Sequence, residues 1–90
     1  MTALQSAREQ EDMLSNELRN WEFMKQTANN TMFELEFRNK RMYDLNETPD
    51  SALRSRIISL HCHVAVCEDT IYEYKTALLD IEERILELIR

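Results

Sequence analysis

Two histidines and two cysteines stand close together in the segment His61-Cys62-His63, which is followed by Cys67. On a helix, His63 and Cys67 are one turn apart, so an imidazole nitrogen and a thiolate could bind the same zinc ion. A structural zinc site has four ligands and commonly a Cys-x-x-Cys spacing, and neither is visible here. Cys67 also falls at an apolar helical position where a small thiol packs well. His63 and Cys67 are the only metal candidates, and we expect no cofactor.

Other groups capable of acid–base chemistry are carboxylates such as Glu82, Glu83 and Glu87. A helix surface gives these side chains no cleft, and a charged solvated face explains them. His61 could face Glu36 as a pH-sensitive pair, or it could lie on a solvated flank. Two helices without loops cannot bring a nucleophile and a base together in a pocket. We therefore expect that this chain is not an enzyme.

Composition and charge disfavour several classes of protein. The 90 residues make at most one small domain, and the absence of glycine disfavours phosphate loops and β-hairpins. A formal net charge of -6 disfavours binding to nucleic acid. No apolar run approaches the roughly 18 residues of a membrane span, and no signal-peptide pattern is found. Two cysteines on one helix fit a reducing compartment, so we expect a cytoplasmic protein that binds neither nucleic acid nor membranes.

The strongest pattern is a heptad repeat in the last third of the chain. Apolar residues follow one another in alternating steps of four and three, which predicts a helix over about 49–89 that packs along another helix through one face, the seam. The period-two alternation of a strand is absent. One register of this seam is formed by Ile57, Val64, Ile71, Leu78 and Ile85, and the other by Leu53, Leu60, Cys67, Tyr74, Ile81 and Leu88.

A first helix is predicted over about 3–45. Thr2 and Ser6 are candidate N-caps, because each has Gln or Glu three residues later. Three seam positions are polar, and such groups either fix register and partner number or extend their heads into water; we expect Asn39 to be paired or near the hairpin end. The two registers of this seam are Ala7, Leu14, Trp21, Ala28, Leu35 and Met42, and Leu4, Glu11, Leu18, Lys25, Met32 and Asn39.

A turn is predicted at residues 46–48. Asn46 tolerates the left-handed conformation that ends a helix, and Thr48-Pro49-Asp50 is typical of an N-cap, a first helical proline and an acidic second residue. A link of about three residues makes the helices antiparallel neighbours. The expected fold is therefore all-α: a single two-helix antiparallel coiled-coil hairpin over 1–90, cut from a longer chain, with self-association into a bundle as an open alternative.

A register for this hairpin can be proposed from residue sizes and charges. Small Ala28 faces branched Ile71, and large Trp21 faces Leu78. Two ion pairs, Glu17 with Arg84 and Glu22 with Lys75, would flank the seam and select the register. The remaining pairs of the same register are Met42 with Ile57, Leu35 with Val64, and Leu14 with Ile85.

Apolar residues remain that one antiparallel pair of helices cannot bury. On the second helix they recur every seven residues, about 100° around the helix from the seam. Such surplus usually marks an interface, although scattered exposed apolar residues are normal in any protein. The predicted partner-binding residues are Phe33, Phe37, Ile58, Tyr72, Leu79 and Leu86.

The stretch from Ile58 to Glu83 resembles the second arm of a helical hairpin in the stalks of kinesin-4 family motors, a group that includes the Costal-type kinesins of Hedgehog signalling. The resemblance lies in Ile57, Leu60, Val64, Glu68-Asp69, Ile71, Tyr74-Lys75 and Glu82-Glu83, and in the preceding turn with Pro49.

This resemblance implies a non-catalytic stalk segment of a microtubule motor, associated with the cytoskeleton. Such a segment would fold back to restrain the motor domain of its own chain or scaffold signalling partners. The first helix departs from the family pattern because it is less basic and more aromatic. Two other hypotheses stay open: a homo-oligomerisation module in which two hairpins form a four-helix bundle, and a subunit of a multi-chain helical assembly.

Overall fold

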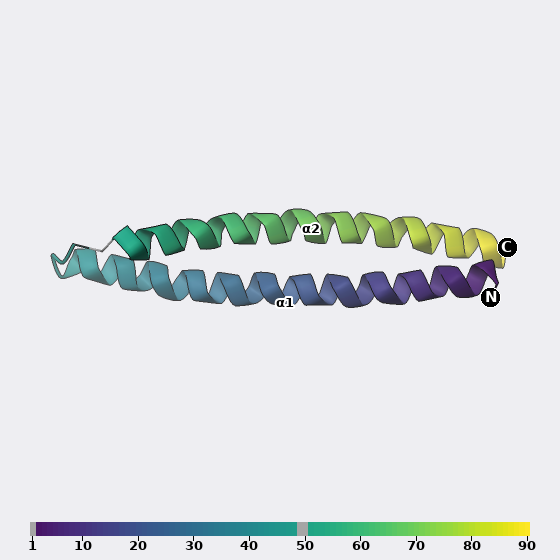
Figure 1. Ribbon diagram of the computed structural model, residues 1–90, viewed down its shortest axis with the longest axis horizontal. Helices are drawn as coiled ribbons and strands as arrows, with labels where there is room; N and C mark the ends of the chain where they lie inside the picture. The colour runs from purple at the N-terminus through teal and green to yellow at the C-terminus, as the bar shows by residue number, and fades with distance from the viewer. Residues whose placement is uncertain (1, 49–50) are drawn as a thin grey trace.

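The computed structural model describes residues 2–48 and 51–90, which form two long helices side by side (Figure 1). Helix α1 runs over Ala3–Asp44 and α2 over Ser51–Ile89, and the described residues contain no strand. The molecule is a rod of 67 × 16 × 15 Å with a radius of gyration of 20.0 Å, against about 12 Å for a globular chain of this length. The predicted all-α antiparallel hairpin is confirmed.

Hydrogen bonds from side chains and backbone satisfy N–H and carbonyl groups that would otherwise lack partners at the two ends of α1. Thr2 is the N-cap: its hydroxyl accepts from the Gln5 N–H at 3.1 Å, and the Gln5 Oε1 accepts from the Thr2 N–H at 3.0 Å. At the other end Asn46 has φ 59°. The Glu47 N–H donates to the Met42 carbonyl at 2.8 Å, and the Asn46 N–H donates to that of Tyr43 at 3.0 Å. These two bonds form a Schellman motif, which ends the helix.

The expected turn lies between the two described helices. Helix α1 ends at Asp44, with Leu45 as its C-cap, and the described part of α2 begins at Ser51. The predicted cap at Thr48-Pro49-Asp50 involves Pro49 and Asp50, which lie outside the described residues.

The core is a single seam between the two helices. Of the seam residues named from the sequence, Ala28, Leu35, Val64, Ile71 and Ile85 are buried, and Leu14, Trp21, Ile57 and Leu78 are half-buried. Cys67 is completely buried. Leu88, at the open end of the rod, is 40% exposed. The heptad spacing therefore places the same face of each helix inward along the rod.

The polar seam positions of α1 are accommodated in different ways. Lys25 lies half-buried, and its Nζ is 3.5 Å from Glu68 Oε1, while Glu11 is half-buried. Asn39 lies near the hairpin end, but its Oδ1 is buried without a hydrogen-bond partner. The alternative in which Asn39 is paired through this oxygen is therefore wrong.

The register in which the helices meet is shifted by one heptad from the predicted one. Ala7 packs in one cluster with Ile81 and Ile85, and Leu14 lines a hollow with Tyr74 and Ala77. The Lys25–Glu68 contact requires the same alignment. The seam pairs are therefore Ala7 with Ile85, Leu14 with Leu78, Trp21 with Ile71, Ala28 with Val64, and Leu35 with Ile57.

Apolar burial explains the shift. In the predicted register Leu4 and Ala7 would extend past the end of α2, whereas Ala7 is buried in the structure. The observed register gives every seam residue of α2 a partner on α1, because α1 reaches about one turn beyond the start of the described α2 helix (Figure 1). The longer seam removes more apolar surface from water than the predicted register would have.

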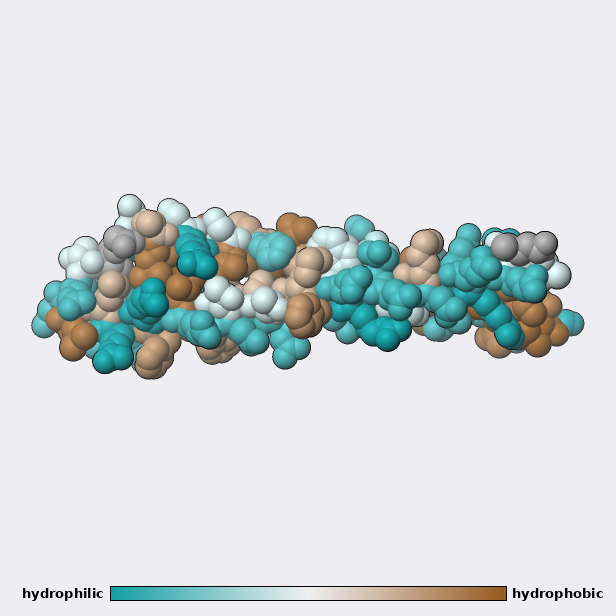
Figure 2. All heavy atoms as spheres, turned by 60° about the horizontal axis from the view of Figure 1, so that its bottom comes forward, coloured by the Kyte–Doolittle hydropathy of each residue, from teal (hydrophilic) through white to brown (hydrophobic). Residues whose placement is uncertain are grey.

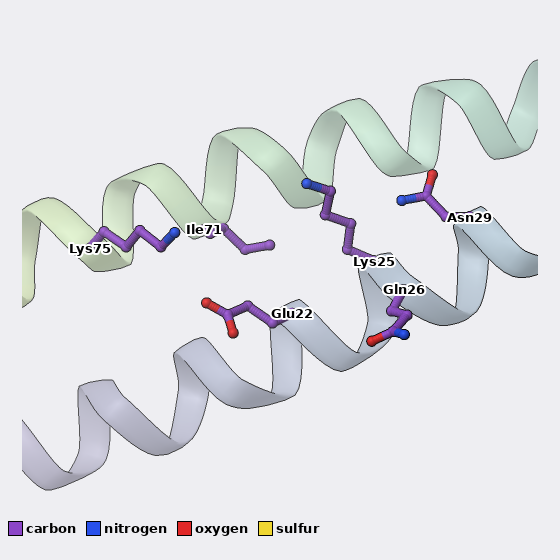
Figure 3. Close-up of a pocket in the computed structure, with 6 residues that line it drawn as sticks. All are labelled: Glu22, Lys25, Gln26, Asn29, Ile71 and Lys75. Atoms are coloured by element: carbon purple, nitrogen blue, oxygen red, sulfur yellow. The ribbon is translucent and has the colours of Figure 1, made fainter.

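Neither predicted flanking ion pair forms. Within residues 2–48 and 51–90 the ion pairs are Lys25 with Glu68 and Glu36 with His61, rather than Glu17 with Arg84 or Glu22 with Lys75. Glu22 and Lys75 do line a common pocket beside the seam, where Ile71 points between the helices (Figure 3). The heptad shift moves Arg84 to the level of the first turns of α1, away from Glu17.

Candidate interaction surface

An unpartnered apolar row runs along the outside of α2. Ile58, Tyr72, Leu79 and Leu86 are 63%, 73%, 61% and 54% exposed, and Ala65 between them is also exposed. Because α2 supercoils with α1, a seven-residue spacing keeps these five residues on one side of the hairpin. We call Ile58, Ala65, Tyr72, Leu79 and Leu86 the outer row.

Charged residues border the outer row on both sides. The inner flank lies between the row and α1, at the positions three residues after Ile58, Ala65, Tyr72 and Leu79. The outer flank lies on the other side of the row, at the positions four residues after each of its members. The inner flank is His61, Glu68, Lys75 and Glu82, preceded by Arg54, and the outer flank is Cys62, Asp69, Thr76, Glu83 and Arg90.

Helix α1 holds part of the inner flank in place. The Glu36 Oε1 lies 2.7 Å from the His61 Nε2, so His61 contacts Glu36, and both side chains also remain exposed on the flank at 56% and 43%. The Arg54 Nη2 donates to the Tyr43 hydroxyl at 2.6 Å, and the guanidinium lies 5.9 Å from the Tyr43 ring centroid. Lys75 and Glu82 form no ion pair with any described residue, and Glu22 of α1 lines a pocket beside the seam together with Lys75.

Phe37 and Phe23 of α1 line hollows that contain no residue of the outer row. Phe33 and Phe37 are exposed, but Phe37 lines a hollow made of α1 residues alone, with Lys40, Arg41 and Asp44. Phe23, also exposed, lines a hollow with Leu60 and His63 on another side of the rod. Figure 2 shows hydrophobic side chains over about half of one face and again at its opposite end, with mostly hydrophilic side chains between these two regions. Among the exposed apolar residues that the structure describes, only the outer row recurs at a regular seven-residue spacing.

The two metal candidates do lie together. Cys67 Sγ is 3.8 Å from His63 Nε2, but no group of three or more His, Cys, Asp or Glu side chains converges in the part of the chain that the structure describes. Cys62 is exposed and Cys67 is buried in the seam. The buried Cys67 thiol therefore has the His63 imidazole as a polar neighbour within the seam.

Neither helix combines the length and apolarity that crossing a membrane requires, over the residues described. Comparison with known protein families, curated proteins and solved structures finds no match to this chain.

Proposed function

We propose that the hairpin is a non-catalytic coiled-coil segment that binds another protein helix through the outer row. The observation that carries this proposal is the exposure of four large apolar side chains which, with Ala65 between the first two, recur every seven residues on one face. A monomeric protein has little reason to repeat exposed apolar residues along 28 positions of a helix, from Ile58 to Leu86. A partner helix would bury the outer row, as α1 buries the seam face of α2.

Tyr72 and Leu79 are the expected anchors of this contact. They stand in the middle of the row, and interface energy concentrates in central aromatic and aliphatic residues that the surrounding contacts shield from water. Ile58 and Leu86 at the ends would contribute less. The ordered inner flank supports the same role, since α1 already fixes Arg54, His61 and Glu68 before a partner arrives.

The resemblance to kinesin-4 stalks gives a narrower form of this proposal. In it, the bound surface is the motor domain of the same chain or a signalling partner, and the hairpin restrains or scaffolds a motor on microtubules. The residues from Ile58 to Glu83 support it. Leu79→Ser in the parent protein would then raise the fraction of microtubule-bound motor. An unchanged fraction would leave only the broader proposal.

Photo-crosslinking in the cells that make the protein tests the broader proposal. A benzophenone amino acid placed at Tyr72 should yield crosslinked species, and the same group at Val66 is the matched control. Val66 is also exposed and apolar but lies outside the row. Adducts from Tyr72 that Leu79→Ser abolishes would support the proposal. Equal yields from both positions, or none from Tyr72, would overturn it.

A further inference from the structure

We infer that the partner on the outer row is a second copy of this chain, with the two α2 helices antiparallel and a two-fold axis beside Tyr72. This inference depends on the proposed function, because it names the occupant of the same face. Two independent features of the row lead to it: the symmetry of its residue sizes and the order of the charges on its flanks.

The outer row is symmetric about Tyr72. Ile58 and Leu86 stand at equal distances on either side of it, as do Ala65 and Leu79. An antiparallel second copy would therefore place its Leu86 beside Ile58, its Leu79 beside Ala65, and the two Tyr72 rings together. The small methyl group of Ala65 leaves space for a leucine, which is the small-beside-large arrangement of a well-packed helix interface.

The charges of the inner flank fit the antiparallel pairing. When two helices pack antiparallel, equivalent flanks face each other. Glu68 would then lie next to Lys75 of the second copy, and His61 next to its Glu82, and the two-fold axis produces each contact twice. Within the described hairpin, Lys75 and Glu82 form no ion pair, whereas the other charged groups of the inner flank contact α1: Glu68 through Lys25, and Arg54 through the Tyr43 hydroxyl. Lys75 and Glu82 are the groups that a second copy would pair.

A parallel second copy would bring like charges together. In a parallel pair the inner flank of one helix faces the outer flank of the other. Glu68 would then meet Asp69, and Glu82 would meet Glu83, so each copy would add carboxylate repulsion. The same charges that favour the antiparallel dimer therefore disfavour the parallel one.

The net charge of the chain does not prevent this association. Each copy carries -6, but the inner flank holds Arg54 and Lys75 against Glu68 and Glu82 and is neutral overall, while the outer flank holds Asp69 and Glu83 against Arg90. Glu68 already contacts Lys25 through its Oε1 at 3.5 Å. Its side chain is still 55% exposed, which leaves a carboxylate oxygen for Lys75 of the second copy.

Charge reversal with sedimentation of the whole chain tests the inference. Lys75→Glu should weaken dimerisation about tenfold or more, because it places carboxylates beside Glu68 at two symmetric contacts. Adding Glu68→Lys should restore it, since the double variant rebuilds the pair between copies while losing the Lys25 contact within each. Lys40→Glu is the matched control and should have no effect. A chain that remains monomeric at high concentration, or a double variant that is not rescued, would overturn the inference.

Cysteine crosslinking decides the orientation. In a Cys62→Ser background, Ala65→Cys and Leu79→Cys chains should each resist dimer crosslinking alone but form a disulfide when mixed. Self-crosslinking of the Ala65→Cys chain without the mixed product would indicate a parallel dimer and contradict the inference. Photo-crosslinking from Tyr72 separates the two proposals: adducts to a different protein, with no dimer, would leave the proposed function standing and refute the second copy.

Discussion

Individual seam residues show how unevenly the hairpin satisfies its polar groups. Lys25 reaches Glu68 at the edge of the seam, so its charged head keeps a partner while its stem covers apolar surface. Asn39 is too short for this solution, and its Oδ1 is buried with no hydrogen-bond partner. A buried polar atom without a partner costs free energy that an apolar residue of similar size would not.

Asn39→Leu should therefore stabilise the hairpin. We expect the free energy of unfolding to rise by about 1–3 kcal/mol, because the substitution removes an unpaired amide oxygen and adds apolar burial opposite Leu53. Urea titration followed by circular dichroism measures this change. Asn30→Leu, at an exposed position of α1, is the control and should stay within about 0.5 kcal/mol. Equal stability of the Asn39→Leu variant and the unaltered chain would show that the oxygen is satisfied in solution.

At the scale of the elements, the two helices depend on each other. A helix in a protein owes most of its stability to tertiary contacts along its apolar face. In this hairpin that face is the seam, which follows the full length of α2. Ile71 lies in the middle of the seam and is buried, whereas Asp69 points away from it. Substitutions at these two nearby positions should therefore differ sharply.

Ile71→Ala should lower the free energy of unfolding by about 2–4 kcal/mol, since it removes buried methyl groups and leaves a cavity beside Trp21. Asp69→Ala should change it by no more than about 0.5 kcal/mol. Urea melts of the two variants at the same protein concentration make the comparison. Similar losses in both variants would contradict the assignment of inward and outward faces on α2.

The register is tested by cysteine pairs in a chain carrying Cys62→Ser and Cys67→Ala. Ala28→Cys with Val64→Cys should form a disulfide within one chain, because these positions share a seam layer. Ala28→Cys with Ile71→Cys should not, because position 71 lies about 10 Å further along α2, beyond the reach of a disulfide. Non-reducing mass spectrometry detects either product. A disulfide in the second pair alone would restore the register first predicted from the sequence.

The whole molecule is a thin rod, with both chain ends together and the turn at the far end (Figure 1). Such a shape has a large surface for its volume, so a long apolar row on it is expensive to leave in water. The proposed two-fold axis beside Tyr72 lies near the middle of α2. Two copies would consequently lie alongside each other over most of their length.

Small-angle scattering should distinguish this arrangement from end-to-end association. For the monomer we expect a radius of gyration near 20.0 Å. On dimerisation the mass from forward scattering should double, while the radius of gyration should rise only slightly, because the copies overlap side by side. Tyr72→Ser should keep the monomer value at concentrations where the unaltered chain dimerises. A large increase in length on association would contradict a contact through the outer row.

Local patterns in the sequence determined the two helices, their inward faces and the end of α1. The heptad spacing identifies the seam because only one face of a supercoiled helix can stay against its neighbour. Asn46 signals the left-handed turn by its tolerance of positive φ. The periodic surplus on α2 was also readable, since a second row at seven-residue spacing cannot belong to the same seam. Each of these properties depends on residues close together in the chain.

The tertiary structure alone decided how the helices align. A heptad repeat fits its partner equally well after a shift of seven residues, so the sequence could not choose between the two registers. The ends of the helices determine the register. Ala7 can be buried, and every seam residue of α2 can have a partner, only if α1 extends beyond the start of α2. The same alignment determined which charged side chains meet. It brings Lys25 beside Glu68, and Lys75 forms no ion pair in the described hairpin. Phe37 lines a hollow formed by α1 residues alone, away from the outer row. The sequence could not show this, because the neighbours of a side chain on the other helix depend on how the two helices pack.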